Sequence, residues 1–304
     1  MNDKPNTRNA AKDVAVKQSV AVVGFGDLGE RLWSMLSHDR WHCIGLRRNI
    51  AALPNDVQGL RVDLRDPETL RVLGRCRPDA LVVALSPEER SEAGYREGFE
   101  QAMDAIVGGL GGHQPRHAFF VSSTRVYAEA AGGWVDENAP LAEADPFAAA
   151  IIAAERRFLD AVHNAVVLRA AGLYGSSPGP MIRRIMEGRL SPAAPPRYGN
   201  RIHRDDVAGF IAHMLDRPVL NRPDKSRLIN LVDDAPLALQ EMEAWLCAQL
   251  GREYRPAAAK DGVGPVHKRL RNARMHATAY ALRYPDYQSG YAAALEQLRE
   301  ASEG

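Results

Sequence analysis

The pattern Gly-x-Gly-x-x-Gly near the start of the chain limits what this sequence can fold into more than any other feature. Its first glycine, Gly24, ends the apolar run Ser19–Gly24, and its third, Gly29, falls inside Asp27–Leu36, which has the apolar spacing of a helix. In such a strand–turn–helix unit the first glycine makes the turn, the second lets the backbone approach a diphosphate, and the third lets the helix pack closely on the strand. The helix N-terminus also offers N–H donors and a partial positive charge to an anion. The motif therefore predicts a dinucleotide-binding turn made of Gly24, Phe25, Gly26, Asp27, Leu28 and Gly29.

Short apolar runs alternate with helical segments through the first half of the chain. The predicted strands after the first are Trp41–Leu46, Leu60–Val62, Ala80–Leu85, Ala118–Ser122 and a run that starts at Val166–Leu168. The predicted helices after the first are Glu68–Leu73, Tyr95–Val107 and Asp145–Val162. Apolar strands separated by helices are typical of a parallel sheet covered on both faces. We therefore predict an α/β fold, a doubly wound parallel sheet of the Rossmann type, over residues 18–172.

The pattern changes after residue 172, where Pro and Gly become frequent. The predicted elements there are helices at Met181–Glu187, Asp205–Met214, Leu239–Leu250 and Tyr291–Glu300, a strand at Arg227–Val232, and irregular chain over Pro265–Gly290. We predict that residues 173–304 form a small C-terminal substrate lobe, whose strand near 227–232 is a candidate to rejoin the main sheet. Residues 1–17 are polar and have no apolar core, which predicts a disordered tail and not a secretory signal.

The composition argues against several classes of function. The formal net charge of the 304 residues is +1, so bulk electrostatics favours neither a nucleic-acid partner nor a membrane surface, and no apolar run is long enough to span a bilayer. The three cysteines are far apart and form no CxxC pair, which fits a reduced cytoplasmic setting better than a disulfide framework. The nine histidines show no metal-ligand spacing, so no metal site is predicted.

The second predicted strand ends in two arginines, where a dinucleotide site that prefers NAD usually has an acid. Guanidinium groups match a phosphate on the 2′ position of the ribose, so Arg47 and Arg48 favour NADP as the cofactor, with NAD kept as an alternative. A second interpretation is that both arginines only cover the sheet edge. Asp63, which ends the third strand, is expected to accept the adenine amino group. The other predicted cofactor-binding residues at strand ends are Leu64, Ala84, Ser86 and Ser122.

An ordered set of landmarks covers most of the chain from the glycine motif onward. These landmarks are Val121–Tyr127 (VSSTRVY), Trp134–Glu137 (WVDE), Leu168-Arg169, Leu173–Gly175 (LYG), Ile202–Asp206 (IHRDD), and Asn230 ahead of Asp233-Asp234. In this order they resemble the extended short-chain dehydrogenase/reductase family, in its NAD-dependent epimerase/dehydratase group. Lys268-Arg269 and Tyr284–Tyr287 (YPDY) resemble a bacterial YeeZ-like subgroup of it.

The resemblance implies a reaction in which a Ser or Thr, a Tyr and a Lys four residues later assist hydride transfer to or from a nicotinamide. Ser123 matches the hydroxyl position, but the Tyr and Lys positions fall on Phe147 and Ile151. The chain has no lysine between residues 18 and 224. The family's usual Tyr/Lys chemistry is therefore not expected.

Three other side chains are candidates for proton transfer. The resemblance places Tyr127 and Tyr174 near the cleft, where Arg125 or Arg169 would assist them, and His203 near the substrate side of the cofactor. For His203 the alternative interpretation is a structural histidine bonded to a neighbouring loop.

Two hypotheses for the function follow. In the first, the chain is an NAD(P)-dependent oxidoreductase or epimerase-like enzyme that acts on a small molecule with non-standard proton-transfer residues. In the second, it binds NAD(P) without catalysis, as a sensor or a partner protein. The arginine-rich second lobe favours an anionic substrate, with solvated surface charge as the alternative. The helices at 95–107 and 145–162 leave a homodimer open.

Overall fold

The computed structural model describes residues 16–176, 179–217, 227–258 and 267–303. The predicted disordered tail therefore lies outside the described residues, except for Val16 and Lys17. None of the helices in the described ranges is long and apolar enough to cross a membrane.

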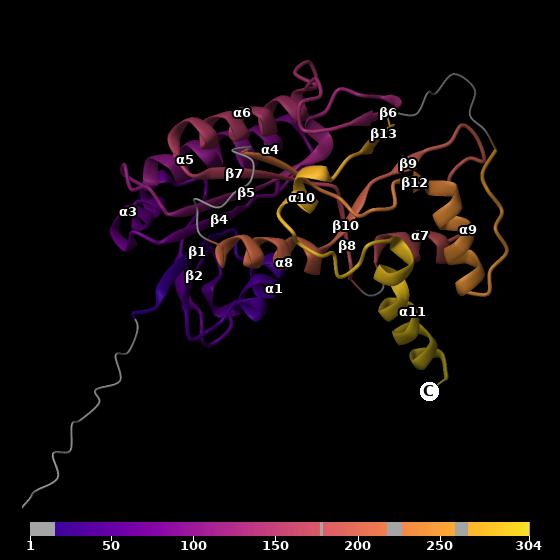
Figure 1. Ribbon diagram of the computed structural model, residues 1–304, viewed down its shortest axis with the longest axis horizontal. Helices are drawn as coiled ribbons and strands as arrows, with labels where there is room; N and C mark the ends of the chain where they lie inside the picture. Colours follow the sequence, from indigo (N-terminus) through magenta and orange to yellow (C-terminus); the bar gives the residue numbers. More distant parts are fainter. Residues whose placement is uncertain (1–15, 177–178, 218–226, 259–266, 304) are drawn as a thin grey trace, which may run out of the picture.

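A seven-stranded parallel sheet forms the centre of the molecule (Figure 1). Its strand order is β11-β7-β5-β4-β1-β2-β3, and all neighbouring strands run parallel. The strands are β1 Gln18–Val23, β2 Trp41–Arg47, β3 Gln58–Arg61, β4 Ala80–Ala84, β5 His117–Ser123, β7 Ala165–Ala170 and β11 Leu228–Leu231. The chain winds outward from β1 in both directions, which is the doubly wound Rossmann order. The predicted fold class is confirmed.

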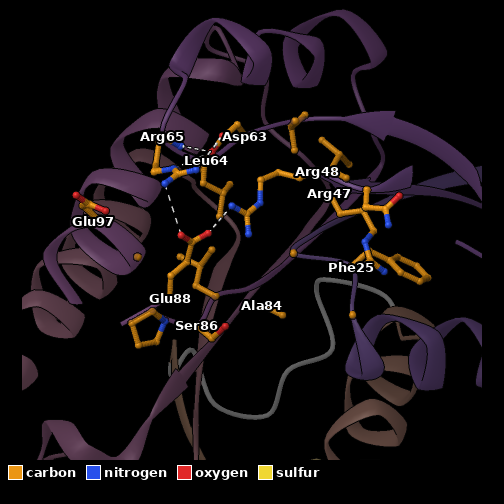
Figure 2. Close-up of a pocket in the computed structure, with 18 of the residues that line it drawn as sticks. Phe25, Arg47, Arg48, Asp63, Leu64, Arg65, Ala84, Ser86, Glu88 and Glu97 are labelled. Atoms are coloured by element: carbon orange, nitrogen blue, oxygen red, sulfur yellow. Dashed lines mark hydrogen bonds and ion pairs between the residues drawn. The ribbon is translucent and has the colours of Figure 1, made fainter. Parts of the chain in front are cut away.

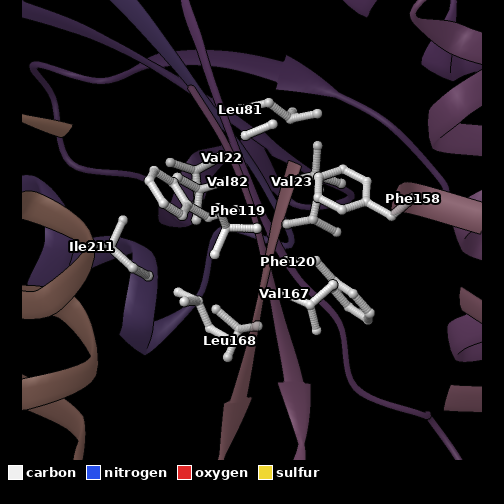
Figure 3. Close-up of a cluster of buried hydrophobic side chains, with 14 of the residues drawn as sticks. Val22, Val23, Leu81, Val82, Phe119, Phe120, Phe158, Val167, Leu168 and Ile211 are labelled. Carbon is white, nitrogen blue, oxygen red and sulfur yellow. The ribbon is translucent and has the colours of Figure 1, made fainter. Parts of the chain in front are cut away.

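The apolar strands form a core on both faces of this sheet (Figure 3). Neighbouring residues of a strand point to opposite faces, so Val22 lies toward Ile211 on one face. On the other face, Phe120 meets Phe158 edge-on, with ring centroids 6.0 Å apart. Burial on both faces explains why the inner strands are mostly apolar and do not alternate with polar residues, whereas the edge strand β3, with the sequence QGLR, is partly exposed.

Helices cover both faces of the sheet (Figure 1). Helix α1 (Asp27–Met35) packs beside α8 (Arg204–Leu215) on one face. The elements on the other face are α2 Pro67–Leu70, α3 Val72–Cys76, α4 Glu92–Tyr95, the π-helix η2 Arg96–Gln101, α5 Ala102–Gly109 and α6 Pro146–Ala161. Because α8 comes from beyond residue 172, the C-terminal half of the chain contributes directly to the covering of the main sheet.

The C-terminal half also builds a smaller second core. Its helices are α7 Pro180–Met186, α9 Leu239–Gln249 and α11 Tyr287–Glu303, and its buried apolar members include Tyr174, Ile182, Ile185, Met242, Leu246 and Leu295. Strand β11 belongs to the main sheet, because Leu228–Leu231 pairs with Val167–Ala170 of β7.

Three pairs of short strands lie outside the main sheet. They are β6 Ala131–Val135 with β13 His267–Leu270, β8 Gly172–Tyr174 with β10 Arg201–His203, and β9 Tyr198–Gly199 with β12 Leu237–Ala238. The pair β8 with β10 contributes Ile202 to the main core and Tyr174 to the second. The prediction of irregular chain over 265–290 is wrong in part, since β13, helix α10 (Ala273–Ala277) and the start of α11 fall there.

Candidate functional site

Each glycine of the turn between β1 and α1 meets a different physical requirement. Gly24 has a φ of +77°, and a Cβ there would overlap the carbonyl oxygen of Ala84. A Cβ on Gly29 would lie 2.9 Å from the ring of Phe25. A Cβ on Gly26 would meet nothing closer than a backbone oxygen 3.9 Å away. The first and third glycines are therefore required by packing, whereas the second leaves an open surface at the helix N-terminus.

A cavity of about 390 Å³ opens from this turn along the carboxyl ends of β1 to β4 (Figure 2). Most of the predicted cofactor-binding residues line it, namely Gly24, Phe25, Gly26, Arg47, Arg48, Asp63, Leu64, Ala84 and Ser86. In a doubly wound sheet, ligands bind at this end of the strands, beside the point where the strand order reverses. That point lies between β1 and β4, so the cavity has the position expected of a dinucleotide site.

The other predicted cofactor residues lie outside the lining of this cavity. Asp27 pairs with Arg31 at 3.1 Å in the first turn of α1, where Leu28 and Gly29 follow it. Ser122 is buried, and its hydroxyl donates to the Glu155 carboxylate at 2.6 Å. The structure therefore holds the Ser122 hydroxyl in an internal hydrogen bond.

Charged side chains ring the cavity beyond the glycine turn, and Figure 2 shows how they face one another. The Glu88 carboxylate lies between two guanidinium groups, 2.5 Å from Arg48 and 3.5 Å from Arg65. Asp63 accepts a hydrogen bond from the Arg65 backbone N–H, which lowers the pKa of the Asp63 carboxyl, and the Arg65 side chain adds to the effect. Asp63 is therefore an ionised acceptor at neutral pH.

Sequence reasoning missed Arg65 and Glu88. Arg65 lies two residues beyond Asp63, and Glu88 two residues beyond Ser86. The only signal was indirect: the carboxyl ends of parallel strands meet at one edge of a sheet, so polar residues just past them gather there.

The predicted hydroxyl residue Ser123 ends β5 and is partly exposed. Its side chain accepts a hydrogen bond from the Arg125 backbone N–H at 3.2 Å. The Arg125 guanidinium lies 4.7 Å from the centre of the Phe147 ring and 5.7 Å from that of Tyr95. Phe147, which stands where the resemblance places a tyrosine, thus packs against the Arg125 cation and the Tyr95 ring, and Ile151, at the lysine position, is buried in the core.

Tyr127 is fixed inside a hydrogen-bond network. Its hydroxyl donates to Asn230 Oδ1 at 2.6 Å, the Arg169 guanidinium stacks 4.9 Å from its ring centre, and the Lys268 ammonium donates to its backbone carbonyl at 3.2 Å. Burial raises the pKa of the Tyr127 hydroxyl. Strand β13 therefore brings a lysine, Lys268, against the backbone of Tyr127.

Tyr174 and His203 lie together, apart from the lining of the cavity, with ring centroids 5.1 Å apart. The Tyr174 hydroxyl donates to the backbone carbonyl of Asp286 at 3.3 Å, and burial raises its pKa. His203 Nδ1 caps helix α8 by accepting a hydrogen bond from the Asp205 N–H at 3.2 Å. The His203 ring lies against the Tyr284 ring, with centroids 3.9 Å apart and planes tilted by 40°, and burial lowers the pKa of His203. These contacts agree with the structural interpretation of His203.

The sheet order, the glycine turn and the cavity at the strand ends define a Rossmann-type α/β protein with the fold of epimerase/dehydratase proteins. No family model matches the sequence. Protein YeeZ of Escherichia coli K12 is 30% identical over 218 residues, which cover 66% of this chain and 74% of that protein. The chain belongs to the family of Protein YeeZ.

Solved structures share the fold over nearly the whole chain. A Methylobacillus flagellatus protein, provisionally described as an NAD-dependent epimerase/dehydratase, is 35% identical with a TM-score of 0.76, covering 93% of this chain and 98% of that one. The human epimerase family protein SDR39U1, whose structure contains NADPH, is 19% identical with a TM-score of 0.71, covering 93% of this chain and 99% of that one. UDP-glucose 4-epimerase of Thermotoga maritima is 14% identical with a TM-score of 0.76, covering 94% and 100%.

Proposed function

We propose that the chain binds a nicotinamide dinucleotide in the cavity at the ends of β1 to β4, and that it prefers NADP to NAD. The observation that carries this proposal is that one cavity is lined both by the turn at Gly24 and Gly26 and by Arg47 and Arg48. The turn at Gly24 and Gly26 offers a diphosphate an open backbone and a helix N-terminus. The arginines offer a 2′-phosphate its natural partner.

The described residues fit such a cofactor. The position of a Cβ on Gly26 is open, so a diphosphate has room against the backbone. Arg47 makes no ion pair within the described part of the chain, which leaves its guanidinium available. No lining residue comes from β5, so this cavity accounts for the adenosine and diphosphate half of a dinucleotide. Relatives of this fold have been solved with NADPH and with NAD, which supports the cofactor class and does not choose between the two.

We propose further that the protein is an oxidoreductase or epimerase-like enzyme with non-standard proton-transfer residues. When bound, the cofactor supplies hydride transfer at its nicotinamide ring. Ser123 would orient a substrate carbonyl, since it is partly exposed at the end of the next strand. Arg125, whose guanidinium pairs with Asp145 at 3.1 Å, would have to exchange this partner to receive an anionic substrate group.

A second candidate is an NAD(P)-binding protein without catalysis. The observation that favours it is that Tyr127, Tyr174 and His203 all hold internal hydrogen bonds. The two tyrosine hydroxyls would have to leave their partners to move a proton to or from a substrate, and His203 is engaged at Nδ1.

Calorimetric titration of the full chain with NADPH and with NADH tests the binding proposal. We expect both to bind, NADPH about tenfold or more tightly, because charge-assisted hydrogen bonds to a phosphate are the stronger ones. Gly26→Glu should abolish binding of both, because a carboxylate would occupy the place of the diphosphate. Gly108→Glu is the matched control, since Gly108 is exposed on α5 with nothing within 4 Å of its Cβ position. Equal loss in both variants, or no binding by the unmodified chain, would contradict the proposal.

Oxidation of NADPH against a panel of carbonyl compounds separates the two candidates. Turnover that Ser123→Ala reduces while cofactor affinity stays unchanged supports the enzyme. Tight NADPH binding without turnover of any panel member supports the binding protein.

A further inference from the structure

Glu88 lies where a 2′-phosphate would need to be received. Its carboxylate contacts Arg48 at 2.5 Å and Arg65 at 3.5 Å on the wall of the cavity, and Figure 2 shows it between the two guanidinium groups. A carboxylate is planar and a phosphate is tetrahedral, but each presents two anionic oxygens that a guanidinium can bind through two parallel hydrogen bonds. Glu88 therefore holds its two arginines in an arrangement that an external phosphate could take over.

Glu88 is held at this place by the packing of its own segment. A Cβ on Gly98 would lie 2.8 Å from the Cα of Pro87, and a Cβ on Gly94 would overlap the carbonyl oxygen of Glu89. These glycines lie four residues apart, so they present one face of the helical segment formed by α4 and η2. Their missing side chains let the chain on both sides of Glu88 lie directly on this face.

The ion pairs of Glu88 are weak enough to be exchanged. The side chains of Arg48, Arg65 and Glu88 are 56%, 54% and 53% exposed. Pairs that are this exposed contribute little to stability, because water screens them. Breaking the ion pairs of Glu88 therefore costs the fold little free energy. If a phosphate were bound beside it, the Glu88 carboxylate would be repelled by a like charge, which is unfavourable.

The charges on the cavity wall are balanced in this arrangement. Three arginines, at 47, 48 and 65, face three carboxylates, at 63, 88 and 97. A dinucleotide with a 2′-phosphate brings more negative charge than one without. Glu88 is the carboxylate that contacts both Arg48 and Arg65, while Asp63 also pairs with Arg65 at 3.4 Å. The same carboxylate is a good acceptor for a ribose 2′-hydroxyl.

We propose that Glu88 is the residue that limits selectivity for the 2′-phosphate, as an internal competitor for Arg48, and that Arg65 is a second phosphate-binding guanidinium. The inference rests on the proposed binding of a nicotinamide dinucleotide and adds to it the control of cofactor choice. The 2′-phosphate of a bound dinucleotide displaces Glu88 from both arginines. A dinucleotide with a 2′-hydroxyl instead leaves Arg48, Arg65 and Glu88 paired.

Titration of the full chain and three variants with NADPH, NADH and adenosine 2′-monophosphate tests this. Glu88→Gln should raise the affinity for NADPH and for adenosine 2′-monophosphate about three- to tenfold and leave the NADH affinity unchanged or lower. Arg65→Gln should lower the NADPH affinity about tenfold, with little effect on NADH. The matched control is Glu68→Gln, which removes another exposed ion-pair partner of an arginine, Arg71, outside the cavity, and should change neither affinity.

The double variant shows whether the two residues act through each other. The change in NADPH affinity caused by Arg65→Gln should differ between the Glu88→Gln variant and the unmodified chain. The reason is that in the variant the Glu88 carboxylate no longer competes with the phosphate for Arg65. Binding of NADPH that neither variant alters, or equal changes for NADPH and NADH, overturns the inference and leaves the proposed function intact. Binding of none of the three ligands by the unmodified chain overturns both.

Discussion

The guanidinium of Arg169 and the carboxylate of Glu155 form a buried ion pair between β7 and α6, at 2.7 Å, with both side chains 3% exposed. The Arg169 Nε also donates to Glu155, so the contact is two-pronged. The same carboxylate receives the Ser122 hydroxyl, which leaves few lone pairs of this buried group unused. The pair joins the strand before the second lobe to the helix that covers the main sheet.

Glu155→Gln should destabilise the fold strongly, because it leaves the Arg169 charge buried without a counter-charge. Removal of one partner of a buried pair costs about 3–5 kcal/mol. Urea unfolding followed by circular dichroism measures the loss. Glu143→Gln is the matched control, since its pair with Arg156 is 63% and 60% exposed, and it should cost less than about 1 kcal/mol. Equal losses in the two variants would refute the role of burial.

Asp233 should make stability fall as the pH rises. Burial raises the pKa of its carboxyl from 3.8 to about 7, so between these values the folded chain holds a proton that the unfolded chain has released. Stability is therefore greatest below pH 4 for this group and is lost as the pH approaches 7, by up to about 4 kcal/mol at 1.36 kcal/mol per pKa unit. Asp233→Asn should remove this dependence. Unfolding free energies of both proteins at pH 5 and pH 8 measure it, and parallel pH profiles would contradict the assignment.

The first two glycines of the turn should respond differently to alanine. Gly24→Ala should destabilise the protein by more than about 1 kcal/mol, because φ is positive there and the Cβ would overlap Ala84. Gly26→Ala should leave the melting temperature nearly unchanged and still weaken dinucleotide binding, since its methyl group would project into open space. Differential scanning fluorimetry with and without NADPH separates the two effects. An unchanged NADPH-induced rise in melting temperature in Gly26→Ala would count against the placement of the diphosphate.

Tyr127→Phe should affect stability and leave any turnover in place. The change leaves the buried Asn230 Oδ1 without its donor, which costs about 1–3 kcal/mol. The control is Tyr254→Phe, because the buried Tyr254 hydroxyl makes no hydrogen bond within the described part of the chain and its loss should cost little. A fall in turnover without loss of stability in Tyr127→Phe would instead assign this phenol a role in catalysis.

The main sheet was predictable because most of its strands are buried on both faces and their sequences are therefore apolar runs. Their ends are shifted by only one or two residues, as for β1, predicted at 19–24 and found at Gln18–Val23. The short strands outside the main sheet gave no such signal. Strand β6 has the sequence AGGWV, with two glycines, and its partner β13 lies far away in the sequence, so only the tertiary fold makes it a strand.

The candidate site was predictable where the place of a single residue next to a predicted strand was enough to indicate its role. The glycines and the arginines at the end of β2 are of this kind. Ser122 and Ser123 are not, because adjacent residues of a strand point to opposite faces and the sequence does not say which face is which. The structure turns Ser122 to Glu155 and leaves Ser123 partly exposed. The pairing of Arg65 with Glu88 joins loops after β3 and β4, which no local pattern predicts.

Strand β11 has a consequence for how the protein is made. Strand β11 completes the edge of the main sheet beside β7, but in the sequence it comes after β8, α7 and α8. During synthesis, the N–H and C=O groups on that side of β7 stay unpaired until residues 228–231 have emerged from the ribosome, and an unpaired edge invites wrong partners. The nascent Rossmann unit is thus left open on one side until well into the second half of translation, and that is the interval in which a chaperone would matter most.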